Sequence, residues 1–206
     1  MLKVWGRNTS SNVQKVMWAT GEMSLPVERI DVGGPFGKTR EPAYLAMNPN
    51  GLVPTLEEED GFTLWESNSI LRYLAAKHQS SLEPADLRVR ANAQKWMDWQ
   101  LSVAQPAILP LFMALLRTPP EKRDPKVVDD LKAKLTEVMR MLDAQLAQTE
   151  YVAGDFSYGD IPVGIVAHRF MLFVPERPTL PGLERWYAAL GRRPAFVEHV
   201  GNIPLT

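Results

Sequence analysis

The stretch NGLVPTLEEEDGFTLWESNSI, residues 50–70, changes character several times over a short distance. A turn pair (NG) precedes the dipeptide Val53-Pro54, and apolar and polar residues then alternate. The DG pair that follows is typical of a tight hairpin turn, and a second alternating run comes after it. Glu66 and Ser67 stand where helical spacing of apolar residues begins. The stretch therefore predicts two strands, VPTLEEE and FTLWE, joined as a hairpin and followed by a helix over residues 67–77.

The residues before this stretch predict a strand, a helix and a second strand. LKVWG has a short strand pattern that ends at Gly6, apolar residues recur at helical spacing from Asn12 to about Met23, and VERIDV alternates. Two successive strands joined through a helix form a parallel crossover. A loop, GGPFGKTREP, and a short helix, AYLAM, complete the order β-α-β-α-β-β-α, which ends near residue 78.

Beyond this module the sequence predicts helices alone. The helical patterns cover residues 86–116, 125–148, 160–173 and 181–190, with a last turn near 194–199. Pro106 and Pro110 are expected to bend or break the first of these helices. We therefore predict an α+β protein with a first domain over residues 1–78, a polar linker over 79–85 and an all-helical domain over 86–206.

The composition excludes several classes of function. The chain has 206 residues and no cysteine, which excludes disulfides, thiolate metal sites and any mechanism in which the protein supplies its own thiol. A net charge of −1 gives no general attraction to nucleic acid. The apolar segment AILPLFMALL is interrupted by Pro110 and is shorter than the ~20 residues that cross a bilayer, and the N-terminus lacks the apolar core of a signal peptide. His78, His168 and His199 are too scattered for metal-ligand spacing. We expect a cytoplasmic protein that binds no metal, nucleic acid or membrane.

The segment NTSSNVQKV, residues 8–16, gathers polar side chains at the start of a predicted helix. Ser11, followed three residues later by Gln14, fits a capping box. Ser10 would then lie just before the helix with a free hydroxyl, where backbone N–H groups and the helix dipole favour an anion. The alternative is that all of these polar residues only cap and turn.

Two features of residues 50–70 have both a structural and a functional interpretation. The Val53-Pro54 bond could be an ordinary trans bond, or a cis bond that lets the Val53 backbone pair with a bound peptide as an added strand would. Ser67 could simply cap the next helix, with Glu66 exposed. In the functional interpretation, the helix N-terminus holds a carboxylate and Glu66 holds an ammonium group. An α-amino acid head group carries that pair of charges.

Together these features resemble the soluble glutathione transferases, and the resemblance covers essentially the whole chain. NPNGLVPTL and WESNSILRYLA are typical of glutathione-binding thioredoxin-like domains. In SYGDI, Ser157 and Asp160 look like the S-x-x-D capping box of this family, with a structural role. The resemblance implies a thioredoxin-like first domain and glutathione as co-substrate. It also implies a homodimer in which the first domain of one subunit lies against helices of the other.

The resemblance also implies which residues bind the substrates. Glu66 and Ser67 would hold the γ-glutamyl group, and the Val53 backbone would pair with the cysteinyl backbone beside a cis Pro54. Leu52 stands where the family often has a polar residue, so a cation from the preceding loop would bind the glycine carboxylate. The expected glutathione-binding residues are Val53, Pro54, Glu66, Ser67, Lys38 and Arg40. For the electrophile, Phe112 and Met113 are expected to line an apolar pocket, the alternative being core or dimer contact.

The resemblance implies that a polar side chain at the start of the first helix activates the glutathione thiol, with Ser10 as the first candidate. Members of the family use Tyr, Ser or Cys as the donor, but this chain has no cysteine and its first tyrosine, Tyr44, lies far past the first strand. Ser10 falls where Theta-like and Delta-like classes keep their catalytic serine. Those classes often read Ser-x-Pro-x-Arg-x-Val, whereas Asn12 and Gln14 occupy the third and fifth positions here, which leaves the assignment open. The candidate donors are Ser10, Thr9, Ser11 and Asn12.

The function implied by the resemblance is conjugation of the reduced glutathione thiolate to hydrophobic electrophiles, with peroxide reduction as a side activity. One alternative is a non-catalytic binding or scaffold protein of the same fold. Another is a glutathione-dependent isomerase or dehalogenase. The isomerases usually carry a Ser-Ser-Cys signature, and this chain has Ser10-Ser11-Asn12 instead.

Overall fold

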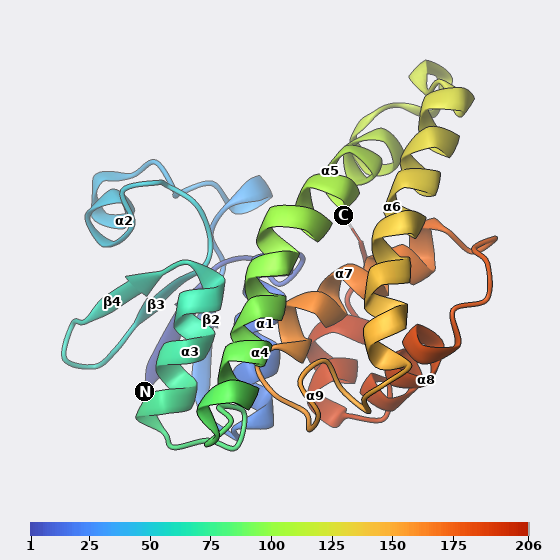
Figure 1. Cartoon of the computed structure of the whole chain (residues 1–206). Coiled ribbons are helices and arrows are strands. Elements are labelled where there is room, and N and C mark those ends of the chain that lie inside the picture. The colour runs from blue at the N-terminus through green and yellow to red at the C-terminus, as the bar shows by residue number, and fades with distance from the viewer. Residues whose placement is uncertain (206) are drawn as a thin grey trace. The chain divides into compact units, whose positions relative to one another are not determined.

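The computed structural model describes residues 1–205, which divide into two compact units (Figure 1). The first unit comprises Met1–Glu83 together with Pro194–Pro204, and the second comprises Pro84–Arg193 together with Leu205. The predicted linker, residues 79–85, spans the point where the chain leaves the first unit. The last helical turn, expected among the helices of the second domain, is grouped with the first unit.

The first unit is a thioredoxin-like fold with a four-stranded mixed sheet in the order β2-β1-β3-β4. The strands are β1 Leu2–Trp5, β2 Val27–Ile30, β3 Thr55–Glu57 and β4 Thr63–Trp65. Strand β1 runs parallel to β2 and antiparallel to β3, and β4 is antiparallel to β3. The helices are α1 Ser11–Glu22, α2 Pro42–Met47, α3 Ser67–Lys77 and α9 Pro194–Phe196, with 3₁₀ helix η1 Gly34–Phe36 and π-helical turn η5 Val197–Gly201. The predicted order β-α-β-α-β-β-α is confirmed.

The core of the first unit follows from the alternation and helical spacing of its apolar residues. Val4 and Leu56 face each other across the β1–β3 ladder and are both fully buried. Helices α1 and α3 pack against each other and bury Val16 and Leu74. The sheet and these two helices support the loops at one end of the strands.

The second unit is helical. Its elements are α4 Leu87–Trp99, η2 Gln100–Ala104, α5 Gln105–Phe112, η3 Met113–Arg117, η4 Pro120–Lys122, α6 Pro125–Leu146, α7 Asp160–Phe173 and α8 Pro181–Leu190. Helix α7 packs against α4, α5, α6 and α8, and nearly all of its residues are buried. Because α7 is apolar apart from Asp160, His168 and Arg169 and is buried over most of its length, it forms the core of this unit.

Pro106 and Pro110 were expected to bend or break the first helix of this unit, and they do not break it. The helical run continues from Leu87 to Arg117, and π-helical turns precede and follow α5. At the first turn the Gln105 N–H donates to the Gln100 carbonyl five residues earlier, which rearranges the backbone hydrogen bonds just before Pro106. By length and composition this run could cross a bilayer, but core helices of soluble proteins also meet that criterion.

Candidate functional site

The start of α1 differs from the predicted capping box. Ser10, not Ser11, is the N-cap residue: its backbone is extended, with φ −76° and ψ 123°, and its carbonyl accepts from the Gln14 N–H at 2.9 Å. Ser11 is the first helical residue, and the Gln14 side chain is buried. The Ser10 hydroxyl makes no capping hydrogen bond. It therefore remains available at a helix N-terminus.

At the start of α3, Glu66 takes the cap position and Ser67 is the first helical residue. The structural interpretation of Ser67 as the N-cap is therefore wrong. Glu66 has φ +71° and an exposed side chain. A non-glycine residue in such a conformation costs roughly 1–3 kcal/mol, and strain of this kind clusters at functional sites. The Ser67 hydroxyl, almost fully buried, donates to Asn12 Oδ1 at 3.3 Å. This bond joins the N-termini of α1 and α3.

The Val53-Pro54 peptide bond is cis, as the resemblance implies. Strand β3 begins at Thr55, which pairs with Trp5, so Val53 lies just outside the sheet. Within residues 1–205, no backbone hydrogen bond involves the N–H or carbonyl of Val53. Val53 lies against Gly6, because a Cβ atom there would be 3.2 Å from the Val53 Cβ. The loop that carries Ser10 and the loop that carries Val53 are therefore neighbours.

A buried polar cluster supports the loop before Pro54. The Tyr44 hydroxyl donates to the Leu52 carbonyl at 2.7 Å, and Asn48 Nδ2 donates to the same carbonyl at 2.9 Å. Both side chains also bond Thr55 Oγ1, at 3.0 Å and 3.2 Å. Burial raises the pKa of Tyr44, which keeps its hydroxyl protonated. Sequence reasoning missed this cluster, because its members come from α2, a loop and β3 and share no local motif.

Cationic side chains border the same loops. Arg40 Nη1 donates to the Asn50 carbonyl at 3.4 Å, whereas Lys38 lies on an exposed segment with φ +67°. Arg7, which the sequence analysis did not single out, extends along Gly34, since a Cβ atom there would be 3.0 Å from the Arg7 Cδ. The pair of glycines at residues 33 and 34 was the only sequence signal for such a close approach. Of the two predicted cations, Arg40 is the one whose side chain bonds the loop that leads to Val53.

In the helical unit, Phe112 is half-buried and Met113 is 47% exposed. The Phe112 ring lies 6.4 Å from that of Phe173, measured between centroids. The guanidinium groups of Arg117 and Arg169 each lie 5.1 Å from the Phe112 ring centroid. Phe112 is thus part of an aromatic and cationic cluster rather than a purely apolar one, and the two arginines were not among the predicted site residues.

The Ser157–Asp160 capping box forms, and its role is structural. Asp160 Oδ2 accepts from the Ser157 N–H at 3.0 Å, and the Ser157 hydroxyl accepts from the Gly159 N–H at 3.2 Å. Asp160 Oδ1 accepts from the Val152 N–H and from Trp186 Nε1, at 3.0 Å and 2.9 Å. Burial raises the pKa of Asp160 to about 6. These bonds fix the start of α7 to the segment before it and to α8.

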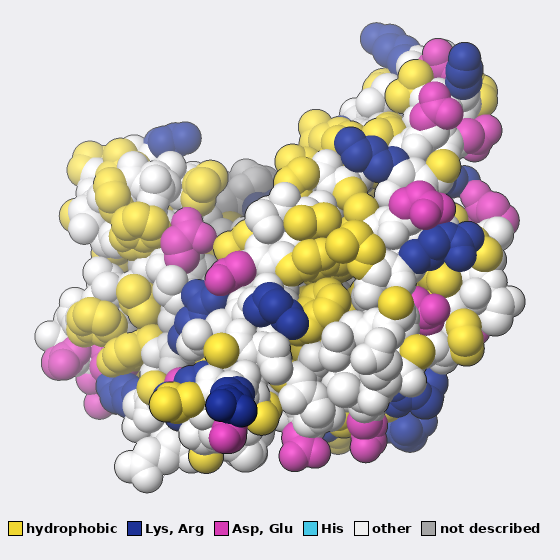
Figure 2. All heavy atoms as spheres, viewed as in Figure 1, with side chains coloured by type: hydrophobic (Ala, Val, Ile, Leu, Met, Phe, Trp, Pro, Cys, Tyr) yellow, Lys and Arg dark blue, Asp and Glu magenta, His cyan; other side chains and the backbone are white. Residues whose placement is uncertain are grey.

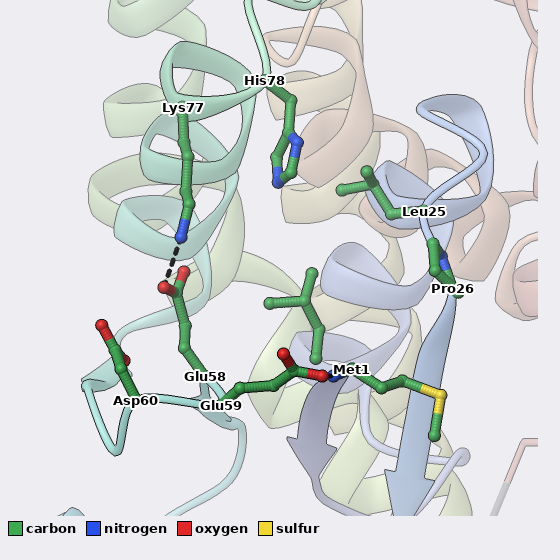
Figure 3. A pocket seen from close by; sticks show the side chains of 9 residues that line it. Met1, Leu25, Pro26, Glu58, Glu59, Asp60, Lys77 and His78 are labelled. Carbon is green, nitrogen blue, oxygen red and sulfur yellow. Dashed lines mark hydrogen bonds and ion pairs between the residues drawn. The ribbon is translucent and has the colours of Figure 1, made fainter.

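A separate pocket of about 360 Å³ lies at the opposite end of the first unit (Figure 3). Figure 3 shows Glu58 and Lys77 pointing toward each other, and they form an ion pair. Glu58 also accepts from the Tyr73 hydroxyl at 2.8 Å. Glu58 follows the last residue of β3 and Lys77 ends α3, so the pocket is about 15 Å along α3 from Ser67. Among the side chains of residues 1–205, no group of three or more His, Asp or Glu is arranged to hold a metal ion.

Comparisons with known proteins agree on one family. Residues 9–77 match the family model described as the N-terminal domain of glutathione S-transferase. The glutathione S-transferase GstB of Escherichia coli strain K12 is 42% identical over 210 residues, which covers 100% of both chains. Glutathione S-transferase 3 of Zea mays is 32% identical, over 99% of this chain and 95% of its own. A crystal structure of the theta class glutathione S-transferase of Xanthomonas axonopodis pv. citri with glutathione bound is also similar. Its TM-score is 0.93 and its identity 41%, over 100% of this chain and 99% of that one.

Proposed function

Because the chain belongs to the glutathione S-transferase family, we propose that it conjugates the thiolate of reduced glutathione to hydrophobic electrophiles, with peroxide reduction as a side activity. The observation that carries this proposal is the bond between Ser67 Oγ and Asn12 Oδ1, which joins two helix N-termini beside the unpaired backbone of Val53. Two helix N-termini favour negative charge, and glutathione brings carboxylates and a thiolate. The chain itself has no cysteine to supply the sulfur.

Each group of the tripeptide has a complementary partner in this proposal. The Glu66 carboxylate takes the α-ammonium group of the γ-glutamyl residue, and Ser67 with the N-terminus of α3 takes its α-carboxylate. The Val53 backbone pairs with the cysteinyl backbone as an added strand would. Arg40 takes the glycine carboxylate in preference to Lys38, since its side chain already lies against the loop that leads to Val53.

Ser10 is the proposed donor to the thiolate. Its hydroxyl is not used for capping, and it lies at the N-terminus of α1, where an anion is stabilised. An unperturbed thiol has a pKa near ~8.5, and a hydroxyl donor with a helix dipole, each contributing about 1 kcal/mol, lowers it by roughly one or two units. The thiolate sulfur then bonds to the electrophilic carbon, and the leaving group departs with the electron pair of the broken bond. Thr9, Ser11 and the Asn12 amide stay as alternative donors.

We also propose a cytoplasmic homodimer. The absence of cysteine fits a reducing compartment.

The dimer would cover an apolar surface of the helical unit. In the most apolar part of the Leu87–Arg117 helical run, only 28% of the residues are buried within the chain. Hydrophobic side chains gather over α4 and α6 (Figure 2), where Trp96, Trp99 and Met141 line a groove. A second copy would remove this surface from water. Light scattering should report a dimer, and Met141→Glu, which puts a charge on the groove, should yield a monomer.

Titration calorimetry with reduced glutathione, followed by turnover of 1-chloro-2,4-dinitrobenzene, tests the proposed activity. We expect binding and turnover, and we expect Glu66→Gln to weaken binding of glutathione. Binding without turnover of several unrelated electrophiles would favour the non-catalytic binding protein. Turnover of haloaromatic or cis-trans substrates without net conjugation would favour the dehalogenase or isomerase. No binding of glutathione would overturn the proposal.

A further inference from the structure

A pocket of about 270 Å³ lies within the first unit, between α1, β2 and the returning C-terminal segment. Helix α1 lines it with Gln14 and Met17, strand β2 with Arg29, and the turn η5 with His199. All of its lining residues belong to the first unit, and none of the residues proposed to bind glutathione is among them. The pocket is therefore separate from the proposed glutathione site.

Gln14 is the residue that distinguishes this pocket. It is only 3% exposed, and its side chain lines the pocket. Within residues 1–205, no backbone or side-chain group forms a hydrogen bond with its carboxamide. Burial of an amide without a partner is costly, because the donor and the acceptor both lose water. A partner from outside the chain would satisfy both groups.

The charges around the pocket favour an uncharged ligand. Arg29 forms an ion pair with Asp31 and donates to the Gly6 carbonyl at 2.8 Å, so its charge is already balanced. Burial lowers the pKa of His199, and the nearby Glu198 carboxylate opposes this only in part. The imidazole is therefore neutral at pH 7. Because Glu198 also lines the pocket, an anion would be repelled there.

The size and the apolar walls of the pocket fit a small aromatic ring. A cavity of about 150 Å³ already admits benzene, so this pocket has room for a ring with a polar substituent. Met17 and Ile203 supply apolar contact surface. The Gln14 carboxamide carries a donor and an acceptor side by side, and a second carboxamide can pair with it through two hydrogen bonds.

We propose that this pocket binds a small, uncharged aromatic amide, whose carboxamide pairs with the Gln14 side chain and whose ring contacts Met17 and Ile203. The site does not depend on the proposed transferase activity. Since the two sites share no lining residue, the amide and glutathione should bind at the same time.

Titration of the native chain with nicotinamide, followed by NMR of the Gln14 side-chain amide, tests the proposal. We expect saturable binding with a Kd of about 1 mM, as for other ligands of this size. 3-Acetylpyridine has a methyl group in place of the amide NH₂, and nicotinate is an anion. Each should bind about tenfold more weakly, because a hydrogen bond is lost. Saturating reduced glutathione should change the Kd for nicotinamide by less than about twofold.

Gln14→Leu removes the donor and the acceptor and keeps a side chain of similar size. It should weaken nicotinamide binding at least about tenfold. It should not lower the midpoint of thermal unfolding, because an unpaired amide gives way to an apolar group. Gln148→Leu is the matched control, since it removes the same carboxamide from an exposed position after α6. The control should leave the affinity for nicotinamide unchanged.

Several results would overturn the proposal. The first is the absence of saturable nicotinamide binding to the native chain. Equal affinity for 3-acetylpyridine would show that the carboxamide is not recognised, and displacement by glutathione would place the probe in the proposed glutathione site. Equal loss of affinity in Gln148→Leu, or none in Gln14→Leu, would likewise contradict it. The comparison of the three probes on the native chain decides the matter even if Gln14→Leu does not fold.

Discussion

At the start of α1, the Ser10 hydroxyl occupies the N-cap position without making the capping bond that serines usually make there. Such a bond normally contributes about 1 kcal/mol to stability, and a residue that forgoes it keeps its hydroxyl for another partner. Asn12, by contrast, already accepts from Ser67 through its oxygen, and only its amide nitrogen is left to donate. The two candidates thus differ in how much of their hydrogen-bonding capacity the fold itself uses.

Ser10→Ala should therefore raise the pKa of the bound glutathione thiol by about one unit and lower kcat/KM at neutral pH by roughly tenfold to a hundredfold. The free energy of unfolding should change little, because no capping bond is lost. Spectroscopic titration of the bound thiolate and steady-state kinetics measure the two effects. Ser11→Ala, Thr9→Ala and Asn12→Ala are the comparison variants. A larger effect in any of them would move the donor away from Ser10.

Asp160 is a residue for which burial and hydrogen bonding oppose each other. Burial raises its pKa from 3.8 to about 6, although four donors, from Val152, Ser157 and Trp186, lower it in part. The folded state therefore binds a proton more tightly than the unfolded chain. The contribution of Asp160 is most favourable below pH 3.8 and is lost as the pH rises through about 6.

We accordingly expect the titration of Asp160 to reduce the free energy of unfolding by about 2 kcal/mol between pH 4 and pH 7. Denaturant unfolding of the native chain and of Asp160→Asn over this range tests the expectation, because the variant has no carboxyl group to titrate. The difference between the two curves should fall with rising pH. A difference that is independent of pH would show that Asp160 titrates normally in the folded state. Asp155→Asn, on the loop before α7, is a control.

At the scale of elements, the loop before β3 is held in place by the polar cluster beneath it. The Leu52 carbonyl accepts from both Tyr44 and Asn48, and Thr55 Oγ1 connects the same two side chains. A fixed Leu52 carbonyl fixes the direction of the chain at Val53. The cluster would therefore affect glutathione binding without touching the ligand.

Tyr44→Phe should lower the free energy of unfolding by about 1 kcal/mol, since the Leu52 carbonyl keeps its bond to Asn48. It should also weaken glutathione binding severalfold and leave the pKa of the bound thiol unchanged. Calorimetry and thiol titration separate the two quantities. Tyr73→Phe, which removes a hydroxyl near the far end of α3, is the matched control for binding. Equal losses of affinity in both variants would argue against a positioning role for Tyr44.

The elements themselves were largely predictable from sequence, because their signals are local. The alternation around the DG turn predicts the β3–β4 hairpin, and the apolar spacing predicts α3 with its observed bounds, Ser67–Lys77. The caps of α1 and α3 differ by one residue from the expectation, since cap position depends on backbone angles that serine, asparagine and glutamate can all adopt. Two features could not be predicted: the continuation of the helix through Pro106, and the bonds from Tyr44 and Asn48 to the Leu52 carbonyl. Tertiary packing decides both.

At the scale of the whole molecule, the chain begins and nearly ends in the same unit. After the helical unit, residues 194–204 return to the first unit, where α9 and η5 pack on α1. The Phe196 ring meets the Trp18 ring edge-on, with centroids 4.9 Å apart, and both are buried. Gly21 permits this approach, since a Cβ atom there would be 2.9 Å from the Ala195 Cβ. The C-terminal segment thus completes the packing around the helix whose N-terminus is the proposed thiolate site.

Phe196→Ala should lower the free energy of unfolding by roughly 3–5 kcal/mol, because it empties space beside a buried tryptophan. We expect the lost packing to destabilise α1 more than α7. Amide hydrogen exchange should therefore accelerate more in α1 than in α7. Glutathione affinity should also fall at temperatures where α1 unfolds locally. Val127→Ala, at an exposed position of α6, is the control and should change neither the exchange rate of α1 nor the affinity for glutathione. If exchange rises equally in α1 and α7, the C-terminal segment stabilises the chain as a single cooperative body. If stability falls by less than about 1 kcal/mol, the contact between Phe196 and Trp18 does not hold α1 in place.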